Sequence, residues 1–264
     1  MSYIHSYICR GFSLVEMAMV LLIVALLLGS LLPTLSNQVE QQHMSETRKQ
    51  LDEIQQALIG FTVINGRLPC PADGTIATGQ ANAGMEATIG SGSAMTCANI
   101  ANNAAGGVLP WATLGISETD AWGRRFTYRV TAVFADAISA NTYGYDNNTT
   151  YGCVSTHICT PPISPQYASF ALCSCGGLNI LSAATGSNIA TNVPVVVVSH
   201  GTNGLGAYTT SGQQLPGAAG DEGENADNDN IFVSHDFAPT FDDLVTWVSP
   251  SILFNRMVGA GKLP

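Results

Sequence analysis

Arg10-Gly11-Phe12-Ser13-Leu14-Val15-Glu16 and the apolar run behind it decide the fold of this chain. The run 17–32 is apolar apart from one serine, and no charged residue lies between Glu16 and Glu40. A helix of about 20 such residues is long enough to cross the hydrocarbon core of a bilayer. A secretory signal peptide has a shorter apolar region that ends in a small-residue cleavage site. The stretch therefore predicts a transmembrane helix.

Gly11-Phe12-Ser13-Leu14-Val15-Glu16 resembles the processing site of type IV prepilins and of type II secretion pseudopilins. In that family a short basic leader is cut after the glycine, and the new N-terminal phenylalanine is methylated. The resemblance implies that a prepilin peptidase cleaves after Gly11 and that Phe12 becomes the methylated N-terminus. It also implies that Glu16 neutralises the Phe12 amine when subunits assemble through their apolar helices.

The charge distribution predicts where the chain lies. The formal net charge is −10, which argues against general nucleic-acid binding because that function needs basic surfaces. Arg10 precedes the apolar run and the acidic bulk follows it, so the N-terminus should be cytoplasmic. We expect a single pass through the bacterial inner membrane with a periplasmic C-terminal domain, followed by transfer into a pilus or pseudopilus.

The cysteines agree with an oxidising compartment. Cys9 lies in the leader, and six remain: Cys70, Cys97, Cys153, Cys159, Cys173 and Cys175. An even number in an exported chain indicates up to three disulfides. We expect Cys70 to pair with Cys97, and the other four to pair among themselves. Thiolate ligands for a metal are the alternative, although no histidine has the spacing of a zinc finger.

The domain organisation follows from these segments. We expect a cleaved leader at 1–11, a transmembrane or filament-core helix at 12–35, its amphipathic half at 36–66 and a globular pilin-like domain at 67–264. Apolar residues recur at helical spacing in the amphipathic half, at Met44, Leu51, Ile54, Leu58 and Phe61. The predicted fold class is α+β: a long N-terminal helix packed on an antiparallel sheet, pilin-like, with long disulfide-bearing loops.

Hydrophobic periods predict the elements of the globular domain. Residues 126–130 alternate as a strand with one solvent-exposed face, and they follow Asp120-Ala121-Trp122-Gly123, which is similar to the turn entering the first sheet strand of major pseudopilins. Further strands are expected at 167–173, 193–198 and 231–234. Helical segments are expected at 98–105, at 109–115 and from 243 to about 257, where Pro250 could interrupt the last one.

The acidic loop 221–230 contains the carboxylates Asp221, Glu222, Glu224, Asp227 and Asp229. Oxygen ligands of this kind are what calcium prefers, although the spacing departs from that of an EF-hand. Major pseudopilins hold calcium in a loop near the C-terminus, so the resemblance implies a calcium site here. A solvated acidic loop is the alternative.

The resulting functional hypothesis is a non-enzymatic structural subunit of a type IV pilus-like filament or a type II secretion pseudopilus. Its partners would be the inner membrane, a prepilin peptidase and other pilin or pseudopilin subunits. One alternative is a pilus-tip, adhesin-like minor pilin that binds a ligand through loops 72–107 and 141–166. The other is a membrane-anchored periplasmic enzyme, although the sequence contains no Gly-x-Ser-x-Gly or His-Glu-x-x-His motif. A catalytic triad in the structure would favour the enzyme.

Overall fold

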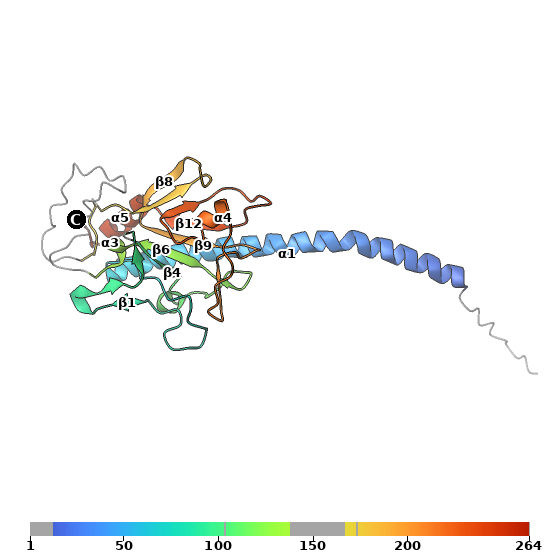
Figure 1. Cartoon of the computed structure of the whole chain (residues 1–264), viewed down its shortest axis with the longest axis horizontal. Coiled ribbons are helices and arrows are strands. Elements are labelled where there is room, and N and C mark those ends of the chain that lie inside the picture. Colours follow the sequence, from blue (N-terminus) through green and yellow to red (C-terminus); the bar gives the residue numbers. More distant parts are fainter. Residues whose placement is uncertain (1–12, 103, 138–166, 173, 264) are drawn as a thin grey trace, which may run out of the picture. The chain divides into compact units, whose positions relative to one another are not determined.

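A computed structural model of the chain describes residues 13–102, 104–137, 167–172 and 174–263 (Figure 1). The side chains of residues 28–37 lie outside this description. The chain divides into two compact units, Met1–His43 and Met44–Pro264.

Helix α1 (Leu14–Asn65) has 52 residues and runs through both units. It begins with reciprocal hydrogen bonds: Ser13 N donates to Glu16 Oε2 (2.9 Å) and Glu16 N donates to Ser13 Oγ (3.2 Å). This is the capping-box arrangement, which satisfies two backbone donors that a helix start leaves open. At the other end Gly66 has φ +72° and donates its N–H to Thr62 O (2.8 Å). The predicted helix end at Asn65 is confirmed.

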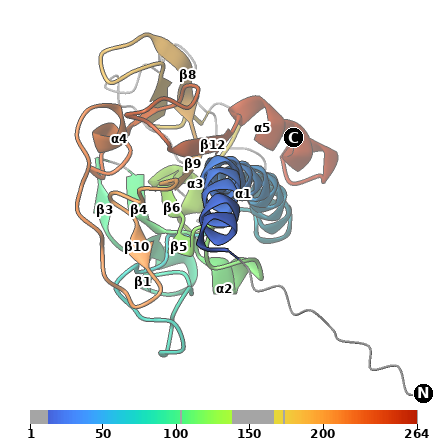
Figure 2. The same cartoon turned by 90° about the vertical axis from the view of Figure 1, so that its right-hand side faces the viewer.

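The largest sheet has five strands in the order β12 (Leu244–Val248), β9 (Val195–Ser199), β6 (Thr127–Thr131), β4 (Ala104–Val108) and β3 (Ile100–Ala101). All neighbouring strands are antiparallel. Figure 2 shows the strands following one another from β12 to β3. The four valines of β9 are all buried, as expected for a β-branched run in the sheet interior.

In the part of the chain that the structure describes, three smaller sheets accompany it. One contains β11 (Ile231–Val233), β7 (Leu178–Leu181) and β8 (Asn188–Val193), and its β11–β7 pair is parallel. The other two pair β1 (Thr88–Ile89) with β2 (Thr96–Cys97), and β5 (Arg124–Arg125) with β10 (Tyr208–Thr209). The remaining helical elements are η1 (Gly92–Ala94), α2 (Trp111–Leu114), α3 (Ala132–Ala135), α4 (Asp221–Glu224) and α5 (Pro250–Gly259).

The predicted fold class is wrong as stated. It placed a transmembrane-plus-amphipathic helix on one antiparallel sheet, with long loops between the strands. Within the described ranges, no helix is long and apolar enough to cross a membrane, which differs from the transmembrane helix predicted at 12–35. The strands form four sheets, one of them partly parallel, because segments expected to be loops carry short strands of their own.

The core of the second unit lies on both faces of the five-stranded sheet. One face buries residues of β6, β9 and α5 against the apolar stripe of α1: Leu51, Ile54, Leu58, Tyr128, Val130, Val195, Val197, Leu253 and Met257. The opposite face packs Val196 and Val198 against residues of β7 and β11. The helical stripe expected from the spacing of apolar residues is therefore buried at its centre, as predicted.

Three of the predicted elements are wrong. Segment 98–105 was expected to be helical, but β3 and the start of β4 occupy it. Residues 244–248 form β12 rather than a helix, and α5 begins after it with Pro250 in its first turn. Proline suits a helix start because its φ is already helical. No strand occurs in the described residues 167–172. The strands expected at 193–198 and 231–234 and the short helix within 109–115 are present.

The strand expected at 126–130 was predicted to have one exposed face, and this is also wrong. Arg125 is fully buried and Arg129 is 2% exposed. Arg129 Nε donates to Asn230 Oδ1 (2.9 Å) and Nη1 donates to Asn228 Oδ1 (2.7 Å). Loops distant in sequence cover these two side chains: Gly74 and Ile76 before Arg125, and Asn228 and Asn230 after Arg129. A period-two pattern does not reveal such cover.

The predicted Cys70–Cys97 disulfide is present, with both cysteines buried. Cys175 is also disulfide-bonded. Cys153, Cys159 and Cys173 lie outside the described residues.

Replacing both Cys70 and Cys97 by alanine should lower the free energy of unfolding of the full chain. A crosslink closing a loop of about this length restricts the unfolded chain by about 3 kcal/mol. Chemical denaturation with and without reductant checks this: the wild type should lose stability on reduction, and the variant should lose less. Equal midpoints for oxidised wild type and variant would contradict the prediction.

Candidate functional site

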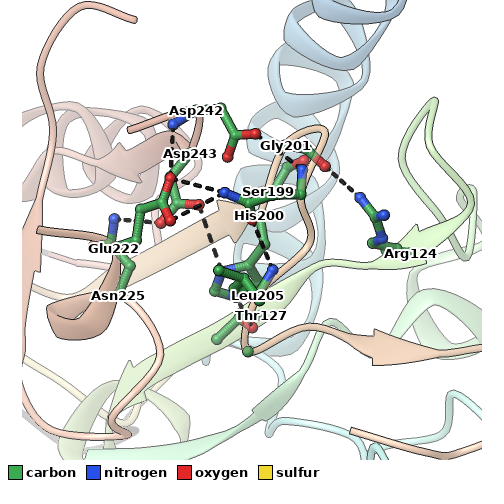
Figure 3. A network of polar contacts seen from close by, with 12 residues as sticks. Arg124, Thr127, Ser199, His200, Gly201, Leu205, Glu222, Asn225, Asp242 and Asp243 are labelled. Atoms are coloured by element: carbon green, nitrogen blue, oxygen red, sulfur yellow. Dashed lines mark hydrogen bonds and ion pairs between the residues drawn. The ribbon is translucent and has the colours of Figure 1, made fainter. Parts of the chain in front are cut away.

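Three carboxylates meet where α4 packs near the start of β12. Glu222, Asp242 and Asp243 can each bring one oxygen to within 4.8 Å of the others. Glu222 and Asp243 are 5% exposed, so most of this negative charge is removed from water. Figure 3 shows these side chains together with His200, which follows β9.

The loop after β9 brings the carboxylates together. Gly201 has φ +51°, and a Cβ at this position would collide with the backbone oxygen of Asp242. Glycine is therefore required both for the left-handed conformation and for the close approach of the two segments. Arg124 Nη1 holds the same loop by donating to Gly201 O (2.6 Å) and Thr202 O (2.7 Å).

Hydrogen bonds orient some of the oxygens of each carboxylate. Glu222 Oε1 accepts from Asp242 N (3.0 Å), and both of its oxygens lie 3.0 Å from Asn203 Nδ2. Asp242 Oδ2 accepts from Asn203 N (2.9 Å). Asp243 Oδ2 accepts from Asn225 Nδ2 (2.8 Å). One oxygen of each aspartate is thus oriented by a neutral donor.

The other aspartate oxygens are left open. Asp242 Oδ1 and Asp243 Oδ1 are buried and have no hydrogen-bond partner among the described residues. The same holds for Nδ1 of His200, a residue with no exposed surface, which lies 3.7 Å from Asp243 Oδ1. Three unsatisfied polar atoms in one place are unusual, because buried polar groups are normally paired.

The electrostatics of the cluster are unfavourable. Burial, and to a smaller extent the neighbouring carboxylates of Glu222 and Asp243, raise the pKa of Asp242 to about 6. Among the groups that act on this carboxyl, only the backbone N–H of Asn203 lowers the pKa. The anionic form of the cluster is therefore poorly stabilised by the residues around it.

The five carboxylates predicted as one calcium loop are divided between different places. Glu222 belongs to the cluster above, whereas Glu224, Asp227 and Asp229 form a second, more exposed group within 4.8 Å of one another. Asp221 accepts from Ala184 N (2.7 Å) and contacts His235 Nε2 (3.1 Å). Asp221, Glu222 and Glu224 lie on the single turn of α4, where their side chains point in different directions. Proximity in sequence therefore did not bring the five carboxylates together.

Sequence reasoning missed Asp242 and Asp243. They lie about 20 residues after Glu222 and were interpreted as part of a helix start. A pair of acidic residues directly before a strand carries no motif. Only the antiparallel pairing of β12 with β9 brings them against the His200 loop.

The residues predicted to act in processing and assembly are not part of this cluster. Gly11 and Phe12 are outside the described residues, and Glu16 lies in the first turn of α1, bonded to Ser13. The Ser13-x-x-Glu16 spacing is a capping-box signal that the sequence analysis did not use.

A hydroxyl, an imidazole and a carboxylate also form a chain of contacts next to a cavity. Thr127 Oγ1 lies 2.8 Å from His200 Nε2, and His200 Nδ1 faces Asp243 Oδ1 at 3.7 Å. Thr127 is one of the residues lining a cavity of about 600 Å³. The order matches that of a nucleophile, base and orienting acid, but the second distance exceeds a hydrogen bond.

Asn225 is the buried donor on which the cluster depends. Its amide bonds both Val233 and Asp243, so Asn225→Asp would place a fourth carboxylate against the other three. We expect a loss of stability on the order of 3 kcal/mol. Denaturation in chelator should show this loss for Asn225→Asp and almost none for Asn188→Asp, which adds the same charge at an exposed position. Similar midpoints for the two variants would refute the dependence.

Comparison with known proteins gives no match: no protein-family model, no curated protein and no solved structure is similar to this chain.

Proposed function

We propose that this chain is a structural subunit of a type IV pilus-like filament or a type II secretion pseudopilus. The observation that carries the proposal is the sequence Gly11–Glu16, whose last three residues begin α1 and are followed by an apolar run. On this proposal a prepilin peptidase removes residues 1–11, Phe12 becomes the N-terminus, and the chain joins a filament through the first part of α1. Processing takes place at the inner membrane, with the second unit on the periplasmic side.

The surface of α1 supports this role. In the first unit, apolar side chains are exposed all around the helix between positions 14 and 27: Leu14, Val15, Met17, Met19, Val20, Leu21, Leu22, Ile23, Val24, Leu26 and Leu27. A helix that is apolar on every side needs an apolar environment around it. The equivalent helices of neighbouring subunits would supply one.

Glu16 has a specific part in the proposal. A carboxylate in an apolar helix bundle is costly unless a cation pairs with it. Cleavage after Gly11 creates a cation, the Phe12 amine, at the end of the chain that carries Glu16. Pairing of these charges between adjacent subunits would fix how far one helix is shifted along the next.

The disulfide supports an extracytoplasmic location for the second unit. Disulfides persist in oxidising compartments and are rare in the cytoplasm. Cys70–Cys97 joins the segment after α1 to the β1–β2 hairpin, so an oxidising environment would stabilise the start of this unit.

The first test is the mature N-terminus. Mass spectrometry of protein from its native host should find a chain beginning at methylated Phe12, and Gly11→Val should leave an uncleaved precursor. Ser13→Ala, which removes a helix cap but not the cut site, is the matched control and should be processed. A wild-type chain that keeps Met1 would overturn the proposal.

A second candidate function, acyl transfer, is favoured by the series Thr127, His200 and Asp243 beside the cavity. In such a reaction Thr127 Oγ1 would attack a carbonyl carbon while its proton passes to His200 Nε2, and His200 would return that proton to the leaving group. It ranks second because the 3.7 Å gap leaves the imidazole unoriented by Asp243.

Hydrolysis of p-nitrophenyl acetate distinguishes the two functions. If the chain is only structural, wild type and Thr127→Val should both match buffer once surface reactivity is subtracted. If it is an acyl-transfer enzyme, Thr127→Val should reduce a wild-type rate by at least about 100-fold. His200→Gln should then reduce the rate similarly.

A further inference from the structure

We propose that Glu222, Asp242 and Asp243 bind one divalent cation, with calcium as the ion that suits them. This site is independent of the proposed filament function. It differs from the calcium loop expected from the sequence, because two of its three ligands come from the residues before β12.

The first observation is the convergence of three carboxylates from two separate segments. One oxygen from each lies within 4.8 Å of the other two, which is close enough for a single ion to contact all three. Oxygen ligands of full negative charge select hard cations such as calcium and magnesium.

The second, independent observation is the open Nδ1 of His200. This side chain has no exposed surface, its Nε2 is paired with Thr127, and its Nδ1 faces Asp243 Oδ1 beyond hydrogen-bond distance. With Asp242 Oδ1 and Asp243 Oδ1 it makes three buried polar atoms without partners. One bound ion would give all three atoms a partner. The two carboxylate oxygens would coordinate the ion, and the imidazole nitrogen would accept a hydrogen bond from a water bound to it.

The charge of the cluster selects a cation rather than a water molecule alone. A water could donate to both open oxygens, but it would leave the mutual repulsion of the carboxylates in place. The nearby Arg124 directs its guanidinium to the carbonyls of Gly201 and Thr202. A divalent ion held by all three carboxylates would offset their mutual repulsion.

The second acidic group provides an internal comparison. Asp227 is exposed, and one oxygen of Asp227 and one of Asp229 accept backbone N–H groups from residues 229 and 231. These bonds are those of a tight turn and occur without any ion. Nothing at Glu224, Asp227 and Asp229 therefore points to a ligand.

Burial favours calcium over magnesium. Glu222 and Asp243 are 5% exposed, so an ion between them loses much of its water shell. Magnesium dehydrates reluctantly and demands octahedral geometry, whereas calcium accepts irregular sets of six to eight oxygens. Bound calcium would connect α4 to the residues before β12 and restrain the His200 loop.

Calcium binding to the mature full-length protein tests the site directly. Isothermal titration into chelator-treated protein should give one site, and the melting temperature should rise by at least about 5 °C at calcium concentrations 100-fold above Kd. Magnesium at the same concentration should raise it by less than half as much. A wild type indifferent to calcium overturns the proposal.

Matched variants locate the ion. Asp243→Asn and Glu222→Gln keep the shape of each side chain and should each weaken binding by at least about tenfold, whereas Asp227→Asn should change it by less than twofold. Loss of binding in Asp227→Asn, with Asp243→Asn unaffected, would place the ion in the second group and overturn the proposal.

Hydrogen exchange of the wild type covers the case in which a variant does not fold. Calcium should slow amide exchange in segments 200–205 and 242–244 and leave 227–230 unchanged. Protection confined to 227–230 would refute this site.

Discussion

The fully buried guanidinium of Arg125 is the interaction on which the loops around the sheet depend. It donates to Glu118 Oε1 (2.8 and 2.9 Å), to the carbonyls of Gly74 (2.8 Å) and Ile76 (2.9 Å), and to Thr210 O (3.3 Å), and it stacks on Trp111 at 4.5 Å. These partners come from segments up to 136 residues apart in the chain, between 74 and 210. A buried charge is tolerated only when it is hydrogen-bonded throughout, so each of these loops is held in place by the same requirement.

The neighbouring residue extends the same constraint to the opposite side of β5. Arg124 holds the carbonyls of Gly201 and Thr202, which positions the loop that carries His200 against the acidic cluster. The two arginines differ in how well the negative charge around them is balanced. Around Arg125 one carboxylate and several carbonyls balance one cation, whereas near Arg124 three carboxylates gather and the guanidinium is committed to backbone oxygens. Negative charge is therefore concentrated where the loop, α4 and β12 meet.

Individual elements show which parts of the fold local sequence patterns could predict. The valine-rich strand was predicted because β-branched residues in a continuous run suit a buried strand, and it lies between β12 and β6 in the sheet. Leu244–Val248 was assigned to a helix, although its β-branched and aromatic residues also suit a strand, and pairing with β9 decided between the two states. The site was found only in part: the acidic loop supplied Glu222, but Asp242, Asp243 and His200 carry no local signal of proximity.

The sequence by itself determined the end of α1 at Asn65, its buried stripe and the strands at 195–199 and 231–233, because these follow from short-range periodicity and capping. The Cys70–Cys97 pairing was expected, but six cysteines allow 15 pairings and the structure decided among them. The resemblance of Gly11–Glu16 to a prepilin processing site also comes from the sequence alone. Tertiary structure decided the division into four sheets, the burial of Arg125 and Arg129, and the assembly of Glu222, Asp242 and Asp243. The physical reason is that these features depend on contacts between segments far apart in the chain, whose energies outweigh local preferences and leave no trace in any one stretch of sequence.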